Sequence, residues 1–341
     1  MQRRRFLAVF SLPLATVIDP AEATARARTA ARRGAVGRAE VVTVRSVIDT
    51  FAAADERLGG GVGRTAVAEY LAADATTYLR GRFTDDRTRA EMHAAVAELA
   101  RLAGWTAHDT GRPGLAQRYY LYAERLAAES APGHAAFIRR LRAHQAIDLG
   151  HGRACVDLAE SAVAAGKGRV DPATLGQLHL AVARTRAAAG DGHEARVALR
   201  EAERCIARPT ADADRPWWAL AMGVPEPLLA THTAKTLREL NDPAVTGHLQ
   251  ASVDRFDPVT HPRVRALNLI DLGGYHAERG NLEHACGAWS EALGLLDGVN
   301  SARARTAVTG IRSAASPYRS RGNTEIRRVD TAATRWLAAH R

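Results

Sequence analysis

The sequence has little of what builds β-sheets. Only 5% of its 341 residues are aromatic, and β-branched residues rarely cluster, with Val41-Val42-Thr43-Val44 as the main exception. Strands are enriched in these residue types, so the strand signals are weak. Alanine is abundant instead, and it is the best helix former because its side chain loses no entropy on ordering. The composition therefore predicts an all-α protein whose helices pack closely through small residues.

Cysteine is also scarce. Cys155, Cys205 and Cys286 are odd in number and far apart, and no C-x-x-C pair is present. The sequence therefore indicates neither a disulfide framework nor a metal site. Each cysteine lies in an apolar stretch expected to be helical, where a free thiol acts as a small hydrophobic group. A reducing compartment fits this pattern.

Motifs for catalysis are missing as well. The 13 histidines form no H-E-x-x-H pair, no G-x-S-x-G is present, and the carboxylates are scattered at helix-pair spacing. Gly59-Gly60-Gly61-Val62-Gly63, followed by Arg64, resembles a phosphate-binding loop only superficially, because the lysine is absent and a helical segment precedes it. We expect one helix to end there and another to begin. No catalytic residue, metal or cofactor is assigned, and an enzyme is not predicted.

The positive charge lies at the two ends of the chain. The net charge is +10, and all but two of the 47 basic residues are arginine. Residues 1–40 carry +5 and residues 301–341 carry +7, which leaves −2 for the rest. A nucleic-acid-binding body should carry its positive charge on the folded surface, so solvated basic ends are favoured. Direct nucleic-acid binding through the Arg-rich ends is the alternative, and a steep salt dependence would identify it.

The amino terminus raises a question of export. Arg3-Arg4-Arg5-Phe6-Leu7 fits the twin-arginine pattern, and the apolar run to Ile18 is too short to span a bilayer. Pro13 interrupts this run, and basic, Ala-rich sequence continues past the small-residue site at 21–23. Cytoplasmic residence is therefore favoured, with twin-arginine export as the alternative. We expect no membrane span.

One pattern recurs along the chain: a glycine, a small residue five positions later, a variable residue at nine and a small residue at twelve. The copies are Gly111, Ala116, Tyr120, Ala123; Gly150, Cys155, Ala159, Ala162; Gly190, Ala195, Leu199, Ala202; and Gly280, Ala285, Trp289, Ala292. Glycine permits the left-handed residue that ends a helix. The three later positions share one face of the next helix, where small side chains let two helices approach closely.

The turn glycines are 39, 40 and 90 residues apart. The last gap is near twice the usual spacing, and Asn241 is the candidate for the missing turn because asparagine tolerates the left-handed conformation. The stretch 208–228, with four prolines and two tryptophans, predicts a longer connection or an irregular helix pair.

This arrangement resembles tetratricopeptide (TPR) repeats, with a spacing longer than their usual 34 residues. The resemblance implies an antiparallel helix-pair solenoid, a right-handed superhelix; the alternative is a helix bundle whose Ala-rich faces imitate the pattern. We divide the chain into a basic segment or linker (1–40), a TPR-like array (41–320) and a C-terminal capping helix (321–341). In that helix Asn323 is the expected N-cap, and Ile326, Val329, Ala333 and Trp336 form the apolar face.

Two segments carry a further resemblance. Residues 98–127, including AGWTAHDTG (103–111), and residues 290–305 resemble the carboxy-terminal half of actinobacterial regulators that join a helix-turn-helix to a TPR-like array. This resemblance implies a cytoplasmic regulatory module that binds a peptide or protein partner and acts on transcription. The stretch before Val41 lacks the length and spacing of a DNA-reading domain, so DNA recognition is not carried over to any residue.

One constellation is a candidate binding surface. In TPR arrays the first helices line the concave groove, and two stripes with i, i+4, i+8 spacing fall on them. The stripes are Arg101, Trp105, Asp109 and Arg140, His144, Asp148, and the third repeat places Arg184 at the ring position. Guanidinium, ring and carboxylate together suit a peptide clamp. The alternative is that the two aspartates shape turns, that the tryptophan is core and that the arginines are solvated.

Overall fold

A computed structural model describes residues 35–151, 153–209, 215–220, 225–319 and 323–340, and these residues are almost entirely helical. The all-α prediction is therefore confirmed, whereas the predictions for residues 1–34 lie outside the described residues. The helices are α3 (Arg38–Leu58), α4 (Arg64–Glu69), the π-helical turn η1 (Tyr70–Ala75), α5 (Thr76–Tyr78), α6 (Asp86–Asp109), α7 (Pro113–Ala128), α8 (Pro132–Asp148), α9 (Arg153–Gly166), α10 (Pro172–Ala188), α11 (Gly192–Ile206), α12 (Trp217–Leu220), α13 (Pro225–Glu239), α14 (Val245–Asp254), α15 (Pro262–Glu278), α16 (Leu282–Leu295), α17 (Ala302–Arg319) and α18 (Thr324–Ala339). The strands β1 (Ala35–Val36) and β2 (Arg82–Phe83) form a short parallel pair.

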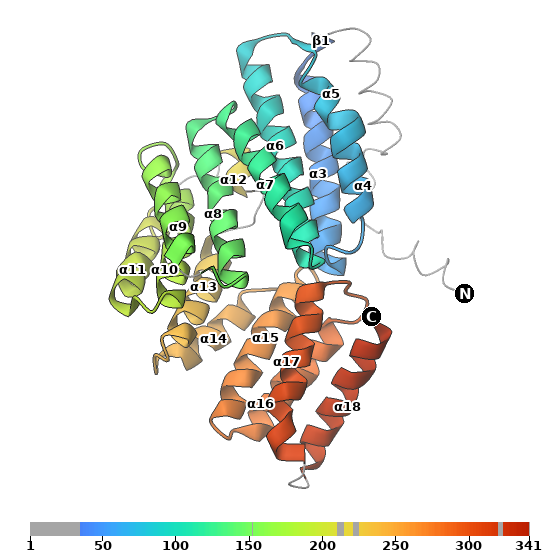
Figure 1. The fold of residues 1–341 in the computed structure, drawn as a ribbon, viewed down its shortest axis with the longest axis vertical. Helices are drawn as coiled ribbons and strands as arrows, with labels where there is room; N and C mark the ends of the chain where they lie inside the picture. The colour runs from blue at the N-terminus through green and yellow to red at the C-terminus, as the bar shows by residue number, and fades with distance from the viewer. Residues whose placement is uncertain (1–34, 152, 210–214, 221–224, 320–322, 341) are drawn as a thin grey trace, which may run out of the picture.

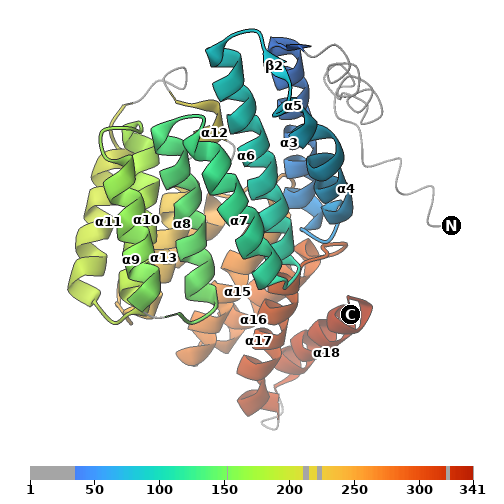
Figure 2. The ribbon, with the colours of Figure 1, turned by 45° about the horizontal axis from the view of Figure 1, so that its top comes forward.

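Neighbouring helices pack against one another in chain order from α6 to α11 and again from α13 to α16, with α10 bridging to α13. Figure 1 shows this progression from α3 (blue) through α9–α11 to α15–α18 (orange and red). The first helix of a pair also contacts the first helix of the next pair, as α8 does with α10 and α15 does with α17. Figure 2 shows α6 to α11 standing side by side as one row. In the part of the chain that is described, no helix is both long and apolar enough to cross a membrane.

The turn residues adopt the backbone conformation that the repeat pattern requires. Gly111, Gly150, Gly190 and Gly280 have φ between 72° and 82°. Asn241 has φ 51° and is the one non-glycine residue with positive φ in the described ranges. The prediction that Asn241 supplies the turn missing from the 90-residue gap is thus confirmed. Its helix pair is α13 and α14, which the sequence pattern could not delimit.

Small residues set the distance between the two helices of a pair. A Cβ atom on Gly104 would lie 2.6 Å from the ring of Tyr120, and one on Gly273 would lie 2.5 Å from Nε1 of Trp289. Both glycines are seven residues before their turn, and both rings sit nine residues after it. Where the aromatic ring is absent, as at Ala159, the facing position is also alanine, Ala143. The facing positions therefore hold either a glycine against an aromatic ring or two alanines.

The C-terminal helix covers the end of the array. The side chain of Asn323 accepts a hydrogen bond from the backbone N–H of Ile326, so it is the N-cap that the sequence predicts. The four predicted apolar positions are buried, and α18 packs on α16 and α17. The indole of Trp336 also donates to the carbonyl of Leu296. The helix therefore buries its apolar face against the preceding helices.

Candidate ligand-binding pocket

A pocket of about 430 Å³ lies on the inner side of the helix row. Its walls come from α3, α6, α8, α10, α13, α15 and α17, and from the connection between α14 and α15. Among the lining residues, Tyr120 of α7 and Arg255 at the end of α14 are the contributions from second helices. The first helices of successive pairs therefore form the pocket together.

A buried ion-pair cluster closes the array around this pocket. Arg263 of α15 is 1% exposed, and its guanidinium donates to Asp55 Oδ2 at 2.8 Å and to Asp109 Oδ2 at 2.9 Å. Asp109 also accepts from the backbone N–H of Gly60 and from Ser301 Oγ, both at 2.9 Å. We call Asp55, Asp109, Arg263 and Ser301 the clasp, because they join α3 and α6 to α15 and α17. In Figure 1, α15 and α17 lie directly beneath the lower ends of α3 and α6.

The clasp holds one guanidinium between two carboxylates. Burial alone would lower the pKa of Arg263, but the carboxylates of Asp55, Asp109 and Glu56 outweigh it and raise that pKa above the usual value. Removing Arg263 would leave both carboxylates uncompensated in the interior. The clasp therefore holds together segments that are more than 150 residues apart in sequence.

Five of the seven predicted groove residues line the pocket, and two do not. The five are Trp105, Arg140, His144, Asp148 and Arg184. Asp109 is fully buried in the clasp instead. Arg101 is 2% exposed, and its Nε donates to Glu98 Oε2 at 2.5 Å. These two residues hold the fold together and are not available to a ligand, which corrects the idea of two equivalent stripes.

Arg101 and Arg140 occupy equivalent positions 39 residues apart, but their surroundings differ. The carboxylate three residues before Arg101, Glu98, is replaced by Phe137 before Arg140. The Arg140 guanidinium lies over the Phe137 ring at 4.5 Å. It is 1% exposed, and its Nε and Nη2 have no hydrogen-bond partner among the described residues. Burial, with Arg101 nearby, lowers the pKa of Arg140 to about 9.

Two stacked imidazoles lie beside Arg140. His144 of α8 and His232 of α13 have ring centroids 4.8 Å apart, with planes inclined by 22°. His144 Nε2 and His232 Nδ1 are buried and have no hydrogen-bond partner within the described ranges. Burial, together with Arg140 and Arg184, lowers the pKa of His144 to about 3. The pKa of His232 is also lowered by burial and by these cations, so both rings are neutral at pH 7.

Two other charged side chains of the pocket, Asp148 and Arg303, lie against neighbouring rings. Asp148 Oδ2 lies 3.0 Å from Nε2 of His108. Burial alone would raise the pKa of Asp148, but this hydrogen bond and nearby cations lower it. Arg303 of α17 lies 5.2 Å from the Trp105 ring, so the tryptophan forms a wall of the pocket through its face. The Trp105 indole N–H donates to Asp55 Oδ2 at 3.0 Å, which links the pocket to the clasp.

Sequence reasoning missed the pocket residues that come from α13 and α17. His232, Lys235 and Arg303 lie outside the four intact repeats, so no periodic position identified them. One signal was present: Lys235 is one of only two lysines in the chain. A second was the exchange of Glu98 for Phe137 between repeats, which marks Arg140 as the arginine without a local carboxylate.

Three hydrogen-bonded residues, Ser130, His134 and Glu98, have the residue types of a hydrolase triad. His134 Nδ1 lies 2.9 Å from Ser130 Oγ, and its Nε2 lies 2.9 Å from Glu98 Oε1. The Ser130 hydroxyl donates to the carbonyl of Ala127, so it is not the donor to the imidazole that a nucleophile must be. Glu98 and His134 are fully buried, and the Trp218 ring stacks on His134. We therefore assign these three hydrogen-bonded residues a structural role.

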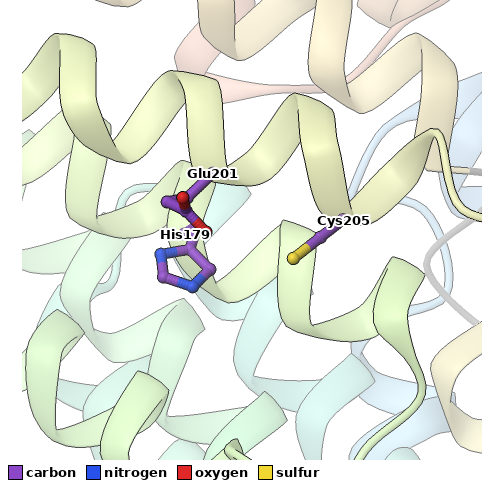
Figure 3. A group of neighbouring side chains, drawn as sticks. All are labelled: His179, Glu201 and Cys205. Atoms are coloured by element: carbon purple, nitrogen blue, oxygen red, sulfur yellow. The ribbon is translucent and has the colours of Figure 1, made fainter.

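His179 of α10 lies near Glu201 and Cys205 of α11, with one ligand-type atom of each residue within 4.8 Å of the others (Figure 3). The sequence indicated no such group, because His179 belongs to a different helix. Glu201 already accepts two hydrogen bonds from Arg204, and burial raises the pKa of the Cys205 thiol. Both features oppose a metal ion, which needs a free carboxylate and a thiolate. We assign the group no metal role.

Comparison with known proteins gives no assignment for this chain. No protein-family model matches the sequence, and no curated protein matches it either.

Proposed function

We propose that the chain is a TPR-like solenoid and acts as a non-catalytic binding module that takes a short peptide segment of a partner in its central pocket. The helix pairs, the left-handed turn residues and the repeated contacts between first helices support the solenoid assignment. Its likeness to actinobacterial helix-turn-helix/TPR regulators is the basis for linking the module to transcriptional regulation. A cytoplasmic location belongs to the same proposal.

One observation carries the binding proposal. Five residues chosen from sequence spacing alone line one pocket, and that pocket is built by the first helices of successive pairs. Its volume of about 430 Å³ lies within the ~300–1,000 Å³ typical of ligand sites. This is room for a few residues of an extended peptide and too little for a folded domain. Polar and charged side chains outnumber apolar ones among the lining residues, which suits a ligand that carries polar groups.

The α14–α15 connection supports a preformed site. Asp257 Oδ1 accepts hydrogen bonds from the backbone N–H groups of Val259 and Thr260, at 3.0 and 2.9 Å. The Phe256 ring contacts the His261 ring edge-on at 5.8 Å. This connection therefore has its own internal order, and it forms one wall of the pocket without the help of a ligand.

Affinity selection from a pool of random-sequence peptides tests the proposal. The chain is incubated with the pool, separated by size, and its bound peptides are sequenced by mass spectrometry. We expect a defined set of peptides to be enriched. Val264→Trp, which fills the pocket from α15, should abolish the enrichment, whereas Val259→Trp, at a 68% exposed position beside the pocket, should preserve it. A pool that emerges unenriched, or enrichment that survives Val264→Trp, would refute peptide binding here.

Direct nucleic-acid binding through the basic ends has weaker support. In the described part of the C-terminal region, Arg312 and Arg319 both pair with Asp330, and Arg328 pairs with Glu325. These ion pairs reduce the positive charge available to phosphates. Binding of a DNA duplex that weakened steeply with rising salt would favour this alternative.

A further inference from the structure

One corner of the pocket holds several buried nitrogen atoms for which the described part of the chain offers no hydrogen-bond partner. They are Nε and Nη2 of Arg140, Nε2 of His144 and Nδ1 of His232. Arg140 and His144 are four residues apart on α8 and therefore share a face of that helix. A buried polar group left without a hydrogen bond destabilises the fold, so such groups are rare unless they serve a ligand. All three residues line the same pocket.

We infer that this corner, which we call the anion corner, binds a carboxylate of the peptide ligand, with Arg140 as the main donor and the His144–His232 pair beside it. The inference rests on the proposed peptide-binding function and names the chemical group that the pocket recognises. Arginine suits this role because its planar fork matches the two oxygens of a carboxylate. The carboxylate belongs either to the free C-terminus of the peptide or to an acidic side chain.

The carboxylates of the pocket do not satisfy this corner themselves. Asp148 lies against His108, and Asp257 is engaged by backbone N–H groups of its own loop. Glu56 lies 3.9 Å from Arg263 of the clasp. Arg184 and Arg303 also line the pocket and add positive charge around the corner, whereas Lys235 lies 3.8 Å from Asp271. An incoming anion therefore meets a surplus of cations.

The comparison between repeats points the same way. At the preceding repeat Glu98 fills the position that Phe137 occupies beside Arg140, and it supplies Arg101 with an internal carboxylate. In the next repeat the arginine is replaced by Leu180. Only at Arg140, among these three equivalent positions, is a buried guanidinium present without its carboxylate. A ligand carboxylate would complete there the pair that Glu98 and Arg101 make within the chain.

Three acetylated tripeptides test the inference by isothermal titration at fixed ionic strength. They are Ala-Ala-Ala with a free carboxyl terminus, Ala-Glu-Ala amide and the uncharged Ala-Gln-Ala amide. At least one charged peptide should bind about tenfold or more tightly than the uncharged one, because each 1.4 kcal/mol of added interaction is worth tenfold. The first two peptides separate a terminal carboxylate from a side-chain carboxylate.

Variants locate the effect. In Arg140→Gln the charged and uncharged peptides should bind with about equal affinity. Arg142→Gln should retain it, because Arg142 lies on the same helix but pairs with Glu124 and does not line the pocket. Thermal unfolding of both variants checks that they fold. Equal binding of all three peptides, or a preference that persists in Arg140→Gln, would overturn the anion corner alone. Failure of every peptide to bind would overturn peptide binding and the anion corner together.

Discussion

Replacing Arg140 with methionine should make the unliganded protein more stable, although Arg140 is among the most deeply buried side chains. Replacing a structural arginine normally destabilises a protein, because the carboxylate that paired with it is left unpaired. Arg140 has no carboxylate partner in the described structure, and its main contact is the Phe137 ring. Methionine keeps an unbranched, flexible stem against that ring and removes the unpaired charge.

The size of the effect follows from the pKa of Arg140. Burial lowers it from 12.5 to about 9, and each tenfold change in proton affinity is worth about 1.4 kcal/mol, so the charged form is disfavoured by roughly 5 kcal/mol. For a base whose pKa is lowered by folding, this destabilisation is fully present below the folded value and disappears as the pH rises toward the unfolded value. It is therefore complete at pH 7. The variant also loses the contact between the guanidinium and the Phe137 ring, which offsets part of the stability gained by removing the charge. Apolar replacements of buried charges typically increase stability by about 1–4 kcal/mol.

Arg101→Met is the matched control, because Arg101 holds the equivalent position one repeat earlier and is equally buried. It donates to Glu98, whose pKa is below the usual value because Arg101 and His134 outweigh the effect of burial. Removing Arg101 should cost about 3–5 kcal/mol. Urea unfolding at pH 7, followed by circular dichroism, measures both variants. If Arg140→Met lost as much stability as Arg101→Met, Arg140 would be an ordinary structural residue and our reasoning would be wrong.

Three further predictions concern the clasp, the helix contacts and the pocket histidines. Arg263→Met leaves Asp55 and Asp109 uncompensated in the interior and should lower the free energy of unfolding by about 3–5 kcal/mol in urea titrations; a loss below about 1 kcal/mol would contradict the clasp. Gly273→Ala places a methyl group against an indole and should lower stability by about 1–3 kcal/mol, whereas Gly287→Ala, in an open helical position, should raise it by up to about 1 kcal/mol; equal effects would count against close helix contact. Folding lowers the pKa of His144, so below pH 6.5 the unfolded chain binds a proton at this residue more readily than the folded protein does. Between pH 7 and pH 5 the wild type should therefore lose about 2 kcal/mol more stability than His144→Gln. Urea unfolding curves of both proteins at the two pH values measure this difference, and equal losses would contradict the prediction.

The turns and the close helix contacts of this fold could be predicted from the sequence, because they depend on residues at fixed spacings within short repeats. Gly111 and Asn241 indicate turns because both residue types tolerate positive φ. Gly104 indicates a close helix contact by its spacing from the turn. These signals involve neighbours along the chain. They located five of the residues that line the pocket.

The long-range features could not be read in this way. Asp55 and Arg263 are 208 positions apart, and no periodicity connects them, so the clasp could not be predicted from the sequence. Asp109 and Asp148 occupy equivalent repeat positions, but Asp109 faces the clasp and Asp148 faces the pocket. The difference arises because Arg263 and Ser301 hydrogen-bond to Asp109, whereas Asp148 lies against His108. Closure of the array, rather than any local pattern, decides which of the equivalent residues a ligand can reach.

The most direct measurement is a crystal structure of the chain with a peptide taken from the selection. We predict density for the peptide in the pocket, with a carboxylate oxygen about 2.7–2.9 Å from a guanidinium nitrogen of Arg140. A peptide bound on the outer helices, or one in the pocket with its carboxylates directed away from Arg140, would contradict the account.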